Sequence, residues 1–184
     1  IRGGAAGALR VQSVGDLNEL QAAREFPIGN GVLDAAMDGD LACVTTEHGS
    51  FHVPRLGEGE GSGEVGRLDL GIPLGRIAIS GAVACLATGS GLQVVDLADP
   101  GHPRLVGQLG PANNHMFLPS TGLLLQDGYA YATEATGGFS VTDVRIPDRP
   151  VLVGWLPDLV GQRNPVLDGQ RILISGAPLG FQAV

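Results

Sequence analysis

The sequence predicts an all-β fold made of repeated four-stranded antiparallel units. The composition is one reason: of 184 residues, 43% are hydrophobic, 30 are glycine and 12 are proline, which is too apolar for a disordered chain and too rich in Gly and Pro for long helices. A second reason is a period of about 42 residues, marked by glycines that each precede a small or apolar run: Gly39, Gly81, Gly128 and Gly169. Apolar residues that open the next run give the same period independently: Leu9, Phe51, Leu92, Phe139 and Phe181.

The clearest repeat unit spans residues 77–109. Its four runs of β-branched and aliphatic residues are separated by Gly or Pro turns, and they cover 77–80, 82–87, 92–97 and 104–109. This pattern predicts a four-stranded antiparallel meander. The next copy repeats the pattern over 123–126, 129–133, 139–144 and 151–156. Because a four-stranded unit of about 40 to 50 residues is the size of one propeller blade, the sequence predicts a β-propeller.

The phase of the repeat divides the chain into one partial propeller. Residues 1–29 are expected to be the end of a blade, with its third and fourth strands. Three blades follow at 30–71, 72–110 and 111–157, the last with an insertion of about five residues, and 158–184 form an incomplete blade. Since closed propellers carry about four to eight blades, we expect part of a larger propeller. The alternative is a small ring in which residues 20–28 supply the fourth strand of the terminal sheet.

Two of these units resemble a known repeat. The run GLQVVDLADP at 91–100, followed by PRLVG at 103–107, resembles the LVIVD repeat of bacterial β-propellers, and so does GFSVTDV at 138–144 with RPVLVG at 149–154. The resemblance is strong over 72–157 and weaker over 30–71. It implies a propeller that is extracellular, displayed at the cell surface or periplasmic, in a family whose molecular role is mostly uncharacterised.

Charge and composition exclude several functions. The formal net charge is −8, and all 11 cationic residues are arginine. Without lysine there is no P-loop and no Schiff base, and an acidic chain with scattered arginines is not expected to bind nucleic acid or an anionic membrane surface. No stretch of 18 apolar residues occurs, so no membrane span is expected in this segment. We also expect no cofactor.

Several polar residues and cysteines have structural explanations. Cys43 and Cys85 lie at the same place in neighbouring units, too far apart for a disulfide, so we expect both to be free and buried. Asp96 and Asp143 end strands before Pro-containing turns and are expected to fix those turns. His102 is expected to be solvated in its turn.

Two further motifs suggest ligands only superficially. The run GSGEVG at 61–66 matches a dinucleotide fingerprint, but no helix follows it, and we expect a flexible loop. The nearby carboxylates of Glu58, Glu60 and Glu64 leave weak Ca²⁺ binding open. His48 and His52, beside Glu47, straddle a turn without completing a metal-ligand set, so no metal site is expected.

The best candidate ligand site is the expected mouth of the central channel. Counting back five residues from each glycine landmark gives the start of the innermost strands, at Asp34, Arg76, Leu123 and Asn164. The insertion around 111–120 adds Asn114 and His115 at the same rim. Polar groups that converge at a channel mouth are a common place for a ligand, so we take Asp34, Arg76, Asn114, His115 and Asn164 as the candidate set. The alternative is that they satisfy one another in a wet channel, with Asp34 and Arg76 forming a salt bridge.

These observations favour a non-catalytic binding or scaffold module, secreted or at the cell surface, with a protein or other subunits of an assembly as partner. One alternative is a propeller hydrolase in which Asp34, Asn164 and His115 hold a metal or polarise water. The other is a structural subunit that assembles by strand complementation.

Overall fold

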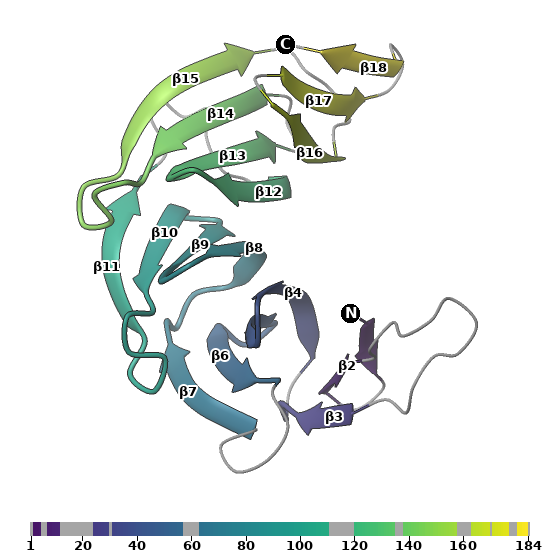
Figure 1. Cartoon of the computed structure of the whole chain (residues 1–184), viewed down its shortest axis with the longest axis vertical. Helices are drawn as coiled ribbons and strands as arrows, with labels where there is room; N and C mark the ends of the chain where they lie inside the picture. The colour runs from purple at the N-terminus through teal and green to yellow at the C-terminus, as the bar shows by residue number, and fades with distance from the viewer. Residues whose placement is uncertain are drawn as a thin grey trace.

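The structure is a computed structural model that describes residues 2–4, 7–11, 24–29, 31–56, 63–110, 120–134, 138–157, 163–169, 171–176 and 180–183. Its strands form five antiparallel sheets that stand side by side along an arc, with the first and last sheets at its two ends (Figure 1). The all-β prediction and the expected four-stranded antiparallel sheets are confirmed.

The sheets follow one another in chain order. The first contains β1 (Arg2–Gly4), β2 (Ala8–Val11) and β3 (Arg24–Pro27). The second contains β4 (Val32–Asp38), β5 (Leu41–Thr46), β6 (Ser50–Arg55) and β7 (Gly63–Asp69). The third contains β8 (Leu74–Ser80), β9 (Val83–Thr88), β10 (Gly91–Asp96) and β11 (Arg104–Leu109). The fourth contains β12 (Ser120–Gln126), β13 (Tyr129–Glu134), β14 (Gly138–Asp143) and β15 (Val151–Pro157). The fifth contains β16 (Arg163–Asp168), β17 (Arg171–Gly176) and β18 (Gly180–Ala183).

One alternative and one expectation from the sequence are wrong. β3 pairs with β2, with Ala8 opposite Pro27, so the segment that includes β3 belongs to the first sheet and does not complete the terminal one. Residues 63–66 are not a flexible loop but the first part of β7, because Val65 packs in the core and Glu64 pairs with Pro54 of β6.

The inner strands of the sheets are neighbours in space. β4, β8, β12 and β16 lie on the concave side of the arc, and each lies beside the next, while β7, β11 and β15 lie on the convex side (Figure 1). Apolar side chains fill the space between sheets. One cluster joins the second and third sheets around Phe51 and Leu86, and another joins the third and fourth around Val94 and Leu125. Stability therefore comes from stacking neighbouring sheets.

Cys43 and Cys85 are free and buried in these clusters, as predicted. Burial disfavours the thiolate and raises the pKa of each thiol to about 12. Both cysteines therefore act as small packing groups.

The landmark register needs one correction in the fourth sheet. The turn between β12 and β13 is Asp127-Gly128, and Asp127 has φ 53°, close to the φ of 57° at Gly39 and Gly81 in the corresponding turns. Asp127, not Gly128, is therefore the structural equivalent of the other landmarks. The reason is turn chemistry, since Asp tolerates the left-handed conformation and the following glycine completes a type I′ turn.

This shift moves one predicted position by one residue, because the equivalent of Arg76 is Gly122 instead of Leu123. The residue that stands where Cys85 stands is Tyr131. Its neighbour Ala132 faces the third sheet, in the cluster around Val94.

Candidate functional site

The candidate site lies near the start of the inner strands. Its structural equivalents are Asp34 in β4, Arg76 in β8, Gly122 in β12 and Asn164 in β16. The pairing of each inner strand with its neighbour shifts register near this position, so a bulge recurs in all four sheets. Bulges re-aim side chains, and here they set the direction of the candidate residues.

Asp34 connects the second sheet to the third. Its Oδ2 atom accepts a hydrogen bond from the backbone N–H of Ile77 at 3.1 Å, and its Oδ1 atom lies 3.6 Å from Nη1 of Arg76. The salt bridge between Asp34 and Arg76, which the alternative of mutually satisfied groups predicted, is therefore present. The Asp34 side chain is 24% exposed and that of Arg76 is 40% exposed, so the carboxylate is mostly enclosed while part of the guanidinium reaches solvent.

Thr45 adds a second connection beside Asp34. It is fully buried, and its hydroxyl lies within hydrogen-bond distance of the Gly75 carbonyl oxygen at 3.0 Å, across the sheet boundary, and of the Asp34 carbonyl oxygen at 3.3 Å. A third connection lies at the other end of these strands, where Asp38 Oδ2 accepts from the Gly81 N–H at 2.7 Å. Neither connection was predicted from the sequence. Only Asp38, placed directly before a glycine turn, offered a signal.

Asn164 lies apart from the Asp34 and Arg76 pair. Its backbone runs against Gly122, where an added Cβ would stand only 2.5 Å from the Asn164 Cα. Gly122 thus allows β16 to approach β12 closely. The structure brings Asp34 and Arg76 together between the second and third sheets. It places Asn164 between the fourth and fifth sheets. Asn114 and His115 lie outside the described residues.

The other polar candidates have local partners. His52 is 1% exposed and its Nδ1 lies 2.8 Å from Oε1 of Glu64, whereas His48 is exposed at the turn, so the two histidines do not form a common site. Glu58 and Glu60 lie outside the described residues, and Ca²⁺ binding stays a prediction. Among the described residues, no group of three His, Cys, Asp or Glu side chains could hold a metal ion.

The turn aspartates have the structural role expected of them. Asp96 accepts from the backbone N–H of Ala98 at 2.8 Å and from Arg104, and these bonds lower the pKa of its carboxyl group. At Asp143 the side chain and then the backbone N–H of Arg145 lower the carboxyl pKa. His102 is 84% exposed, as predicted, and lies 2.9 Å from Asp99.

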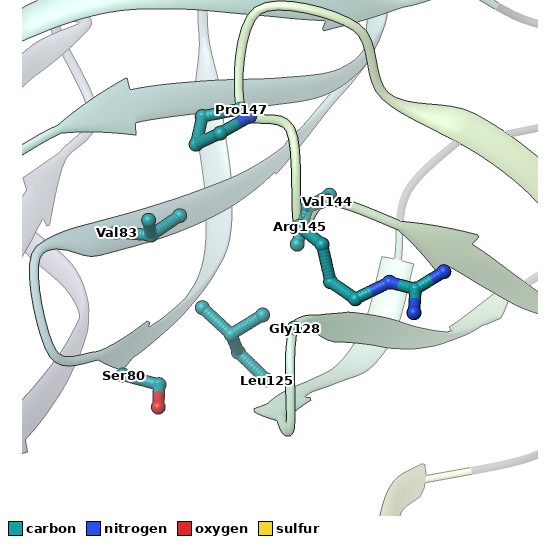
Figure 2. Close-up of a pocket in the computed structure, with 7 residues that line it drawn as sticks. All are labelled: Ser80, Val83, Leu125, Gly128, Val144, Arg145 and Pro147. Carbon is teal, nitrogen blue, oxygen red and sulfur yellow. The ribbon is translucent and has the colours of Figure 1, made fainter.

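A small cavity of about 130 Å³ lies between the third and fourth sheets, at the opposite end of the inner strands from Arg76. Figure 2 shows Ser80 and Val83 on one side and Leu125, Val144, Arg145 and Pro147 on the other. Ser80 stands where Asp38 stands one sheet earlier, and the shorter side chain forms no corresponding bond. The Arg145 guanidinium is already paired with Asp143, and it lies over the Tyr129 ring at 5.0 Å. The cavity is therefore mainly apolar packing space.

Comparison with family models decides which repeat the third sheet carries. The model of the LVIVD repeat matches residues 75–109, the range of β8 to β11. This segment matches the LVIVD repeat. The family occurs in β-propeller proteins, so the resemblance proposed from the sequence is confirmed for this unit. No curated protein matches the sequence.

Solved structures similar to this chain are β-propellers. The computationally designed protein Ika4 has a TM-score of 0.66 at 10% identity, covering 84% of this chain and 91% of that one. BamB from Moraxella catarrhalis has a TM-score of 0.70 at 13% identity, covering 97% of this chain and 52% of its own. The β-propeller domain of Myceliophteria thermophila Cps50 (Swd1) has a TM-score of 0.65 at 11% identity, covering 87% and 54%. The chain thus spans about half of both natural proteins, and these identities establish the fold alone.

Among the described residues, no helix is long and apolar enough to cross a membrane.

Proposed function

We propose that this chain is a non-catalytic binding or scaffold module of a β-propeller, with a protein or an envelope component as its partner. We further propose that it works outside the cytoplasm, secreted, at the cell surface or in the periplasm. The LVIVD repeat at residues 75–109 supports the location through the family resemblance. The binding surface in this proposal is the start of the inner strands.

The observation that supports the proposal is that Asp34 is enclosed by partners within the protein whereas its partner Arg76 is partly exposed to solvent. Asp34 is mostly enclosed and uses its oxygens on Ile77 and Arg76, while Arg76 is 40% exposed with the same Asp34 as its ion-pair partner at 3.6 Å. A guanidinium carries five N–H donors, and one long ion pair leaves donors directed to solvent. Arg76 is thus oriented by the fold to recognise a carboxylate or another acceptor of a partner.

The same geometry weighs against the hydrolase alternative. A metal cation bound at Asp34 would lie close to the Arg76 guanidinium and would be repelled by its positive charge. In the structure Oδ2 accepts the Ile77 N–H, and Oδ1 faces Arg76. In our proposal the Asp34 carboxylate connects the two sheets and orients the Arg76 guanidinium.

The test measures binding of the purified chain to cells and isolated cell envelopes of the source organism. Arg76→Ala should reduce binding at least about tenfold, which corresponds to loss of one charge-assisted contact. The matched control is Arg104→Ala, which removes an arginine that is also exposed and paired with an aspartate, away from the site. Equal loss in both variants, or no binding by the unaltered chain, would contradict the proposal.

A catalytic assay provides the opposite test. The chain is expected to show no turnover of ester, phosphate or amide substrates with or without added Zn²⁺, Mn²⁺ or Ca²⁺. Turnover that depends on a metal and disappears in Asp34→Asn would show that the hydrolase alternative is right.

A further inference from the structure

Among the described residues, proline turns join neighbouring sheets twice, each time on a glycine in the outer strand. The turn after β10 lies on Gly66 of β7, where an added Cβ would collide with the Pro100 carbonyl oxygen and lie 2.9 Å from Pro103 Cδ. The turn after β14 lies on Gly107 of β11 in the same way, against the Pro147 carbonyl and 3.0 Å from Pro150 Cδ. The missing side chain lets a carbonyl oxygen approach the strand backbone closely.

We call such a strand glycine, on which a proline turn lies, a seat. The outer strand of the fourth sheet carries a third copy of this seat. Gly154 is the fourth residue of β15, as Gly66 is of β7 and Gly107 of β11. Each of these glycines pairs with a valine of the neighbouring strand, directly beside a register shift: Val53 with Gly66, Val94 with Gly107 and Val141 with Gly154.

The third seat differs in one respect, since no turn covers it among the described residues. Of the residues that the structure describes, a Cβ added to Gly154 would meet only Val141, at an ordinary contact distance of 3.5 Å. The neighbouring Val153 is 54% exposed, whereas its equivalents Val65 and Val106 are partly buried against the cores. An exposed valine and a glycine that no described turn covers therefore lie next to each other in this strand.

We propose that Gly154 and Val153 of β15 form the docking seat for a third Pro-x-x-Pro turn, one that is joined directly to the end of β18. The topology assigns the source, because each seated turn directly follows the third strand of the next sheet, and β18 is that strand for the fifth sheet. The two Pro-x-x-Pro runs in these 184 residues are 100–103 and 147–150, and both are already seated. The proposal is independent of the binding function proposed above.

The experiment extends the chain in register. Gly180 and Phe181 pair with β17 as Gly91 and Leu92 pair with β9, so residue 184 corresponds to Val95. The sequence of residues 96–109 is therefore appended directly after Val184. A control extension carries serine in place of both prolines. Hydrogen exchange of β15 amides is measured by mass spectrometry, and Trp155, the single tryptophan, reports unfolding by fluorescence.

The proline-containing extension should slow exchange in β15 at least about tenfold relative to the serine control. Gly154→Ala should leave the unextended chain unchanged, because its Cβ has room there, and should abolish the gain in the extended chain. Gly107→Ala should destabilise both chains, since its seat is already occupied. Equal protection from the two extensions, or a gain that survives Gly154→Ala, would overturn the proposal. Protection of β15 that rises with the concentration of the unextended chain would identify a second copy as the occupant and equally overturn it.

Discussion

Replacing Asp34 by alanine should lower the free energy of unfolding by about 2 to 3 kcal/mol, mainly through one hydrogen bond. The carboxylate accepts the N–H of Ile77, a residue that is 4% exposed, at 3.1 Å. A hydrogen bond to a charged group contributes about 1.5 to 3 kcal/mol, and leaving a buried donor unpaired adds to the loss. The ion pair to Arg76 is long, at 3.6 Å, and partly exposed, so it contributes at most about 1 kcal/mol.

These magnitudes make a double-mutant cycle decisive. Asp34→Ala, Arg76→Ala and the double variant are unfolded with urea and followed by far-UV circular dichroism. We expect a cost of about 1 kcal/mol or less for Arg76→Ala and a coupling energy of similar size. Most of the cost of Asp34→Ala should therefore persist when Arg76 is already absent.

The cycle also bears on the binding proposal. Asp34→Asn serves as the matched variant, because its side-chain oxygen can still accept from the Ile77 N–H while the charge is removed, and its cost should fall between those of the two alanine variants. The reasoning is refuted if Asp34→Ala costs no more than Arg76→Ala, or if its effect vanishes in the Arg76→Ala background. Either result would make the ion pair the main connection between sheets, and Arg76 would then be a structural residue.

Three further outcomes are expected. Gly107→Ala should cost about 1 to 3 kcal/mol in urea denaturation because its Cβ collides with a proline turn. Gly110→Ala should be neutral, because no described atom beyond its chain neighbours lies within 4 Å of the added Cβ. Equal denaturation midpoints for the two variants would contradict the seat. Cys43 and Cys85 should not react with a thiol reagent at pH 8 in the folded chain and should react fully in urea, and fast labelling of the folded chain would show that they are accessible. Because the pKa of Asp96 is lowered in the folded state, its contribution to stability should be present above about pH 4 and disappear as the pH falls through that folded pKa. Asp96→Asn should therefore flatten the acid side of a profile of unfolding free energy against pH. An unchanged profile would disprove this role of Asp96.

The sequence was sufficient to predict the sheets because each follows from local information. Alternating apolar runs define the strands, and Gly or Asp-Pro turns define their ends, as in residues 77–109. The role of Asp96 was also predictable, since its partners lie within the same turn. The strand at 63–66 was missed because its glycines and Glu64 resemble a loop, and only packing of Val65 against the next sheet makes it a strand.

The candidate site was predicted less completely, because it depends on which residues face each other across sheet boundaries. The pairing of Asp34 with Arg76 was correct, since both stand in intact copies of the repeat. The assignment at Leu123 failed because Asp127 takes the turn position that glycine takes elsewhere, which shifts the count by one residue. In a strand, a shift of one residue exchanges the two faces, so a small counting error changes which side chain points at the site.

The glycines of the outer strands show which part of a contact between sheets can be predicted from the sequence alone. A glycine inside a strand is unfavourable, so its recurrence at 66, 107 and 154 already signals that something approaches the backbone closely. The partner of each seat lies in the next unit, about 40 residues further along, and only the stacking of sheets reveals it. The structure identifies the partner twice, at Pro100 and Pro147, and this repetition is what makes the open seat at Gly154 interpretable. A seat defined by two filled copies specifies its third occupant more narrowly than exposed valines alone could, because it requires a carbonyl oxygen and a proline ring at set positions.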